Sequence, residues 1–338
     1  MQEIVTVGLD LAKNVFQVHA IDAGGKIIER RQLRRAEVLK FFGGLPPCLV
    51  GMEACASAHY WGRELMKLGH EVRLMPPAYV KPYVKRGKTD AADAEAICEA
   101  VTRPTMRFVA VKTPEQQAVL MLHKTRDLLV RQRTGLINAL RAHLGEYGII
   151  SSKGLGGVTT LVKLVQEAKD LVPAHARSAL HTIAAQLRAL AGEIEQLETQ
   201  IVAWHRNDGA SRRLATIPGI GPITASAIAA AVPDASMFRS GRQFAAWLGL
   251  TPRPHSSGGK ERLGGISKQG DGYLRRLLVV GATAVMRMVR KDAGRHPWAA
   301  QLLERKPVKI ATVAFANKTA RVAWAVMARH QTYQPAVA

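Results

Sequence analysis

The sequence predicts an α/β domain at the N-terminus, followed by two mostly helical regions. Apolar runs rich in β-branched residues and bounded by turn residues occupy the first hundred positions, which is typical of strands. Farther along, apolar residues recur at helical spacing. Charge is also unevenly distributed: of a net charge of +22 over 338 residues, +15 falls in 206–338 and +1 in 1–60. We therefore expect separate domains over 1–112, 113–206 and 207–338.

The first domain is expected to alternate strands and helices. Apolar runs predict five strands, over 4–10, 15–22, 26–33, 48–54 and 71–77. Helical spacing predicts three helices, over 36–42, 59–69 and 91–101. The resulting order β-β-β-α-β-α-β-α is that of the ribonuclease H-like fold.

The middle region is expected to form long helices over 115–147 and 175–206. In the second of these, apolar residues follow alternating steps of three and four, which predicts a coiled-coil seam. The seam would join either an intramolecular helical hairpin or an oligomerisation arm. The glycine-rich segment 151–157 is expected to be the turn or hinge between the helices.

The last third is expected to be mostly helical, with a glycine turn and a long loop. Over 214–232 the pattern predicts helix, turn and helix; in the turn IPGIG, Gly219 and Gly221 permit positive φ and a close approach of backbone N–H groups to phosphate. This is typical of a helix-hairpin-helix, with a plain helical turn as the alternative. Further helices are expected over 238–250, 271–290 and 310–330.

Four acidic residues are placed where strand ends and a helix should converge. Asp10 ends the first strand and Glu53 the fourth, while Asp90 and Asp93 share one face at the start of a helix. Converging carboxylates repel one another unless cations neutralise them, and hard oxygen ligands select Mg²⁺ or Mn²⁺. Two such ions can hold the attacking and leaving oxygens of a phosphodiester. Alternatively, the aspartates are turn residues or, for Asp90, a helix N-cap.

The loop 251–267 combines glycines, cations and a Ser256-Ser257 pair. A serine there could attack phosphorus while nearby cations stabilise the developing charge; the candidates are Arg253, His255, Lys260 and Arg262. An inert Ser-Gly linker is the alternative. The basic loop before Asp90 contains Lys88, which suits a phosphate backbone unless the loop is simply solvated.

The sequence disfavours several classes of protein. Three cysteines form no zinc spacing, which indicates a reduced, cytoplasmic protein. No signal peptide is recognised, and the longest apolar run, 277–286, is too short to cross a bilayer. The positive surplus favours a polyanion, above all nucleic acid, over a basic protein without such a partner. Charge alone does not distinguish DNA from RNA.

Six motifs in order resemble the DEDD-type transposases of the insertion-sequence-110 family, which includes the Piv-type DNA invertases. They are GLDLAKNVFQVH, GMEACAS, GKTDAADAEAI, IPGIG, FAAWLGLTPRPHSSGGK and LRRLL. The resemblance implies a RuvC-like domain whose metal-binding tetrad is Asp10, Glu53, Asp90 and Asp93. It also implies a transient phosphoserine link to DNA through Ser257, with a slip to Ser256 left open. Donor and target DNA, a guiding bridge RNA and a homo-oligomer, dimer or tetramer, would be the partners.

The expected function is therefore that of a bacterial, nucleoid-associated DNA recombinase of a mobile element. Three alternatives stay open: a metal-dependent junction nuclease with an inert serine loop, an invertase without an RNA guide, and a non-catalytic nucleic-acid-binding scaffold. VGLDLAK also resembles a phosphate-binding hairpin of sugar kinases, but the sequence shows no second glycine-rich phosphate loop.

Overall fold

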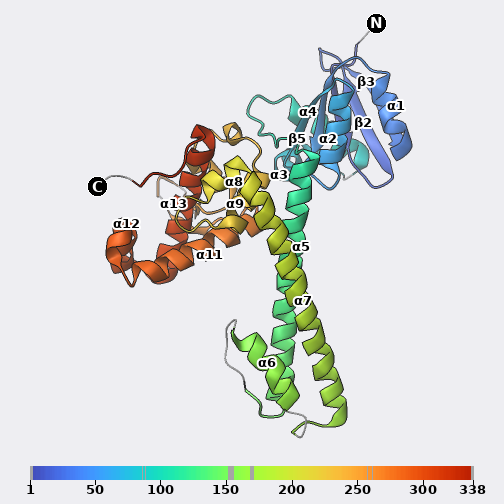
Figure 1. Cartoon of the computed structure of the whole chain (residues 1–338). Helices are drawn as coiled ribbons and strands as arrows, with labels where there is room; N and C mark the ends of the chain where they lie inside the picture. The colour runs from blue at the N-terminus through green and yellow to red at the C-terminus, as the bar shows by residue number, and fades with distance from the viewer. Residues whose placement is uncertain are drawn as a thin grey trace. The chain divides into compact units, whose positions relative to one another are not determined.

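The computed structural model describes residues 3–85, 87, 89–150, 156–167, 171–256, 258–260 and 262–335. The chain divides into two compact units, Met1–Gln116 and Gln117–Ala338 (Figure 1). Lys88 and Ser257, both predicted to be functional, lie outside the described residues. Within the described part of the chain, no helix has the length and apolar character needed to cross a membrane.

The first unit is built on a five-stranded mixed sheet in the order β3-β2-β1-β4-β5. β1 pairs antiparallel with β2 and parallel with β4; β2 pairs antiparallel with β3, and β4 parallel with β5. All five strands were expected from the sequence. Their bounds are Thr6–Asp10 (β1), Val15–Ile21 (β2), Ile27–Arg34 (β3), Leu49–Glu53 (β4) and Glu71–Met75 (β5).

Helices cover the sheet, and alternate residues of β1 face different partners. Val7 and Leu9 pack in one apolar cluster with residues of α1 (Val38–Gly43) and α2 (Ala58–Lys67). Gly8 points the other way, toward α4 (Asp90–Val101). The basic segment expected to be a loop instead contains the short helices α3 (Pro77–Val80) and η2 (Lys81–Tyr83). A turn of 3-10 helix, η1 (Arg35–Glu37), precedes α1.

The second unit begins with a long helical hairpin. α5 (Pro114–Gly145) and α7 (Ala174–Asn207) lie side by side (Figure 1). α6 (Gly156–Glu167) lies near the C-terminal end of α5 and the N-terminal end of α7. Arg126 of α5 donates to Glu198 of α7 at 2.8 Å from Nε to Oε1. One apolar cluster contains residues of all three helices, including Leu140, Leu161 and Leu187. This is the intramolecular pairing that the hairpin interpretation predicts.

The remainder of the second unit is mostly helical around one large apolar cluster. Its helices are α8 (Gly209–Leu214), α9 (Pro222–Ala231), η4 (Ala235–Met237), α10 (Gly241–Trp247), α11 (Gly272–Val289), η5 (Ala293–Arg295), α12 (Pro297–Arg305) and α13 (Val308–Arg329). Neither α12 nor α6 was predicted. α6 begins within the expected turn 151–157, and residues 151–155 of that turn lie outside the described residues. The expected loop 251–267 contains an antiparallel hairpin of β6 (Pro252–Pro254) and β7 (Leu263–Ile266). Its Gly/Ser/Pro composition obscures the strands in the sequence.

Candidate metal centre and serine hairpin

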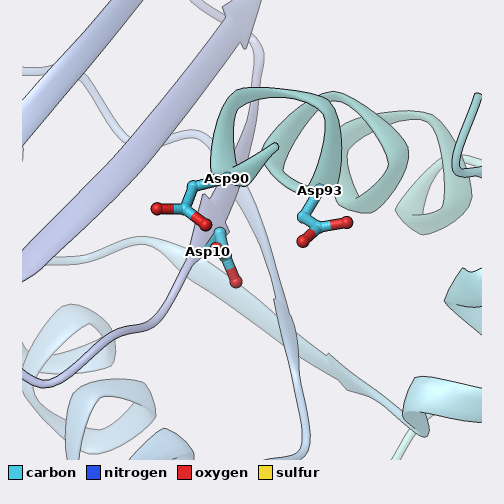
Figure 2. Close-up of side chains that lie close together, drawn as sticks. All are labelled: Asp10, Asp90 and Asp93. Carbon is cyan, nitrogen blue, oxygen red and sulfur yellow. The ribbon is translucent and has the colours of Figure 1, made fainter. Parts of the chain in front are cut away.

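Three of the predicted acidic residues meet at the end of β1. Asp10, Asp90 and Asp93 each offer a carboxylate oxygen, and these oxygens all lie within 4.8 Å of one another. Figure 2 shows Asp90 and Asp93 on the first turn of α4, above Asp10. Asp10 and Asp93 are partly buried and Asp90 is exposed. The predicted convergence of strand end and helix is therefore present for these three residues.

The start of α4 explains why its two aspartates share a face. Thr89 has extended backbone angles, and its Oγ1 accepts a hydrogen bond from the Ala92 N–H at 3.2 Å, so Thr89 is the N-cap. Asp90 is the first helical residue, and the alternative that it serves as the N-cap is wrong. Both carboxylates lie in the first turn, where the helix dipole favours negative charge.

Two glycines let α4 lie close to the sheet. A Cβ on Gly8 would lie 2.2 Å from the Ala94 carbonyl oxygen, and a Cβ on Gly51 would lie 2.7 Å from the Cβ of Val101. Gly8 and Gly51 are register partners on the parallel strands β1 and β4. Because side chains alternate along a strand, Asp10 lies on the same face as Gly8 and is directed toward α4. The sequence signal for this packing was only two strand glycines.

Glu53 lies next to this cluster but is not one of the three gathered carboxylates. Leu9 pairs with Met52, so Asp10 and Glu53 end neighbouring parallel strands, and Glu53 shares the α4-facing side with Gly51. Both acids affect Cys55: desolvation and then the negative charges of Glu53 and Asp10 raise the pKa of this thiol. The structure thus places Asp10 and Glu53 at the C-terminal ends of two neighbouring strands, and it brings carboxylate oxygens of Asp10, Asp90 and Asp93 within 4.8 Å of one another.

The donor set fits a hard divalent cation. Three carboxylates within 4.8 Å of one another repel, and an ion with oxygen preference relieves that repulsion. Lys85 and Arg30 both pair with another acid of α4, Glu95, at 2.6 Å and 3.1 Å respectively.

The hairpin of β6 and β7, here called the serine hairpin because the sequence of its loop contains Ser256 and Ser257, is held together by its own polar groups. The His255 N–H donates to the Arg262 carbonyl at 2.7 Å, and the Arg262 N–H donates to Ser256 Oγ at 3.3 Å. Arg253 donates from Nη2 to the Ser267 carbonyl at 2.7 Å across the base of the hairpin. Ser256 and Arg253 therefore have identified roles in the hairpin, while Lys260 and Arg262 present exposed side chains.

The base of the hairpin is anchored by close backbone packing. A Cβ on Gly270 would lie 1.9 Å from the Trp247 carbonyl oxygen, and a Cβ on Gly249 would lie 2.3 Å from that of Gln269. Arg275 Nη1 donates to the carbonyls of Leu248 and Gln269, both at 2.8 Å. The sequence showed Arg275 only as part of LRRLL and assigned it no role.

The predicted phosphate-binding glycines have a structural explanation as well. Gly219 has φ of 87°, and a Cβ on Gly281 of α11 would lie 1.8 Å from the Gly219 carbonyl oxygen. The glycine turn therefore packs backbone to backbone on α11. Gly221 is the N-cap of α9 and directly precedes Pro222.

A buried polar network connects the helical hairpin to α9 and α11. His123 of α5 lies 3.0 Å from Tyr273 Oη through Nδ1 and 3.1 Å from Ser226 Oγ through Nε2. Ser226 donates its proton to the Pro222 carbonyl at 2.7 Å. Nε2 is therefore the donor to Ser226, and Nδ1 accepts from Tyr273. Burial lowers the pKa of His123 to about 4, in agreement with a neutral ring.

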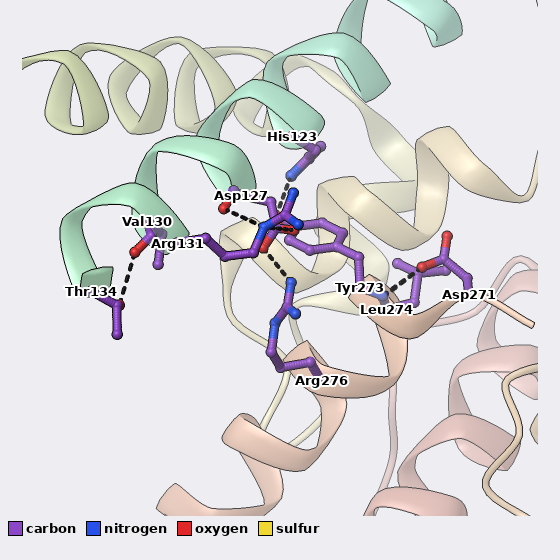
Figure 3. Close-up of polar contacts among 9 residues, drawn as sticks. All are labelled: His123, Asp127, Val130, Arg131, Thr134, Asp271, Tyr273, Leu274 and Arg276. Atoms are coloured by element: carbon purple, nitrogen blue, oxygen red, sulfur yellow. Dashed lines mark hydrogen bonds and ion pairs between the residues drawn. The ribbon is translucent and has the colours of Figure 1, made fainter. Parts of the chain in front are cut away.

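An ion pair continues this connection on the surface. Arg276 of α11 pairs with Asp127 of α5, which also pairs with Arg131 (Figure 3). Sequence reasoning did not identify His123, Tyr273 or Arg276, because their partners lie far away in the chain.

Two transposase family models match the chain. The model of DEDD-type insertion-sequence-110 transposases matches residues 7–149, and the model described as "Transposase IS116/IS110/IS902 family" matches residues 211–299. The chain belongs to the IS116/IS110/IS902 family of transposases. The first match contains all four predicted acids, and the second contains the glycine turn and the serine hairpin.

Curated relatives from several bacteria align over nearly the whole chain. A probable family 20 transposase of Pseudomonas aeruginosa is 53% identical, over 97% of this chain and 98% of its own length. The transposase for insertion sequence element IS1111A of Coxiella burnetii is 42% identical, over 99% of this chain and 92% of its own length. That for element IS1328 of Yersinia enterocolitica is 40% identical, over 96% of this chain and 97% of its own length.

Proposed function

We propose that this transposase moves an insertion sequence by cutting and rejoining DNA strands. The observation that carries the proposal is the cluster of Asp10, Asp90 and Asp93 within a chain whose full-length relatives are named transposases. We assign the first unit a ribonuclease H-like, RuvC-like fold, supported by its strand order and element order. Our proposed domains remain 1–112, 113–206 and 207–338, with a coiled coil in the second and a helix-hairpin-helix in the third.

The carboxylates would hold Mg²⁺ or Mn²⁺. Asp10, Asp90 and Asp93 supply the gathered oxygens, and Glu53 at the neighbouring strand end completes the proposed set. When bound, such an ion neutralises charge on phosphate oxygens during phosphoryl transfer. The chain's own contribution is to hold the acids in place: Thr89 caps α4, and Gly8 lets that helix approach β1.

Ser257 is the proposed nucleophile. Its Oγ would form a bond to phosphorus while the bond from phosphorus to a deoxyribose oxygen breaks, and the serine proton would end on that leaving oxygen. Attack by another strand's hydroxyl on the phosphoserine reverses these changes and frees the serine, so the phosphodiester energy is conserved. The choice of Ser257 over Ser256 rests on its position directly before Gly258 in the SSGGK motif.

Nucleic acid would be bound mainly by the last third of the chain, where +15 of the charge lies. Proposed phosphate contacts are Gly219, Gly221, Arg253, Lys260, Arg262 and, in the first unit, Lys88. We further propose that the protein binds donor DNA, target DNA and a structured guide RNA. It would act as a dimer or tetramer at the bacterial nucleoid. Exposed Lys260 and Arg262 support the phosphate assignment.

Recombination between two plasmids in bacterial cells tests the proposed function. We expect Asp10→Asn, Asp93→Asn and Ser257→Ala each to abolish recombinant product, whereas Ser256→Ala retains it. Retained strand cleavage in Ser257→Ala would instead indicate the metal-dependent junction nuclease. Full activity in all of these variants would indicate a non-catalytic scaffold. Strand inversion that persists without any co-purified RNA would identify the invertase alternative.

A further inference from the structure

The second unit contains a groove that the proposed chemistry does not use. Its volume is about 1480 Å³, and its walls are one face of α13, strand β7, the start of α10 and Trp298 of α12. Sites for a single small molecule measure roughly 300–1,000 Å³, so the groove has room for a segment of polymer. It adjoins the serine hairpin, because Pro252 and Gly264–Ile266 of that hairpin line it.

The interior of the groove is apolar and open to solvent. Leu250, Ile266, Val313 and Ala314 contribute to its lining. Ile310 is 56% exposed and lines the groove, so the groove presents apolar surface to solvent.

Four cations, three of them on α13, line the same groove. Arg242, Lys309, Lys318 and Arg321 line the groove, and all four are exposed. Among the residues that the structure describes, no acidic one lines the groove. None of the four forms an ion pair with an acid in the described part of the chain, unlike Arg126 and Arg276 elsewhere in the unit. Lys318 Nζ lies 4.2 Å from the centroid of the Trp298 ring, which places one cation at the edge of the apolar surface.

We propose that this groove binds an unpaired segment of a nucleic acid strand, with its bases on the apolar lining and its phosphates on the four cations. Proteins that bind single strands combine a basic groove with aromatic side chains on which bases stack. Trp298, which is 40% exposed, is such a side chain in the lining of this groove. A duplex fits less well, because its bases are paired and stacked inside while its phosphates face outward. The proposal rests on the proposed function only for the choice of nucleic acid as the polyanion.

Binding of fluorescein-labelled oligonucleotides to the full-length protein tests the proposal. One sequence is used as single-stranded DNA, single-stranded RNA and duplex DNA, in EDTA, so that failure of the metal or serine chemistry does not affect the result. We expect Lys309→Gln with Arg321→Gln to weaken single-strand binding about tenfold. It should also reduce the slope of log K against log salt by about 1.4, for two lost phosphate contacts. Arg290→Gln with Lys291→Gln removes the same charge from exposed positions outside the groove and is the matched control.

A second pair of variants separates base contact from charge. Ile310→Ser with Val313→Ser should weaken single-strand binding severalfold, leave duplex binding unchanged and keep the salt slope. Leu171→Ser, at another exposed apolar position, is its control. The strand type that loses more affinity, DNA or RNA, identifies the ligand. Equal effects of groove and control variants would overturn the proposal, as would equal losses for single strand and duplex. It would also be overturned if the groove variants changed only the oligomeric mass, because the occupant would then be a second copy of the chain.

Discussion

Gly8 of β1 lies against the backbone of α4 at Ala94: a Cβ on Gly8 would lie 2.2 Å from the Ala94 carbonyl oxygen. This contact sets the distance between the helix that contains Asp90 and Asp93 and the strand that ends in Asp10. The position of the acidic cluster therefore depends on a residue that has no side chain and is not itself a ligand candidate.

Gly8→Ala should separate α4 from the sheet. Overpacking against backbone is not relieved by a side-chain rotation, so we expect a loss of about 3 kcal/mol in the free energy of unfolding, together with loss of recombination. Urea denaturation measures the first effect. Gly43→Ala in α1 is the control, because no atom lies within 4 Å of the new Cβ and alanine favours the helix. Equal stability of the Gly8 variant and wild type would contradict this role.

Divalent metal should stabilise the first unit through its carboxylates. Metal binding that stabilises the folded state by about 1 kcal/mol raises the Tm by roughly 2–4 °C in a domain of about 150–250 residues. We expect Mg²⁺ or Mn²⁺ to produce such a shift in the wild type but not in Asp10→Asn or Asp93→Asn, measured by thermal denaturation against EDTA. Without metal, Asp93→Asn should be at least as stable as wild type, since a repulsion is removed. An unchanged metal-induced shift in both variants would exclude the site.

His123 should make stability dependent on pH. Its pKa is about 4 in the folded chain and 6.5 when exposed, so the unfolded state binds more protons between these values. The neutral, buried form therefore contributes its full stabilisation above about pH 6.5. Roughly 3 kcal/mol of this is lost as the pH falls toward 4.

Urea denaturation at several pH values measures this dependence. We expect His123→Gln to be less stable than wild type at pH 7 and to lose less stability on acidification. The pKa values of His19 and His205 are also lowered, chiefly by desolvation, so some dependence of the same sign should persist. His181→Gln, at an exposed position of α7, is the control for the loss of a histidine outside the buried network. An identical slope in His123→Gln would contradict the assignment.

Substitutions of Arg275 and Arg276, two adjacent arginines of α11, should differ in their effect on stability and on strand cleavage. Arg275→Met leaves the Leu248 and Gln269 carbonyls without this donor and loosens the base of the serine hairpin, at a cost of about 1–3 kcal/mol. Arg276→Met removes an ion pair with a half-exposed arginine, worth at most about 1 kcal/mol. We expect only the Arg275 variant to lose strand cleavage, measured on labelled DNA. Comparable cleavage by the two variants would show that the anchor is dispensable.

Local patterns predicted the strands and much of the acidic cluster. Alternating and β-branched runs are properties of short segments, and Asp90 and Asp93 were placed on one face by spacing alone. That Asp10 would join them followed from its position at a strand end. The position of Glu53 outside the three-carboxylate group depends on side-chain directions that spacing does not specify.

Local sequence patterns did not predict features that depend on residues far apart in the chain. His123 and Tyr273 are far apart in the chain, and nothing local to either indicates the other. Gly8 was one glycine in a strand, for which a bulge, a bend or close packing are all possible reasons. The strands β6 and β7 are not predicted by the sequence, because glycine and proline are depleted in strands.

The most direct test of the proposed chemistry is a covalent link between protein and DNA. The full-length protein with its nucleic acid partners is incubated with labelled DNA and Mg²⁺, then denatured in SDS and resolved by electrophoresis. We expect a labelled, protease-sensitive adduct in the wild type and in Ser256→Ala, its loss in Ser257→Ala, and a marked decrease in Asp10→Asn. An adduct of wild-type yield in Ser257→Ala, or recombination without any adduct, would contradict the account.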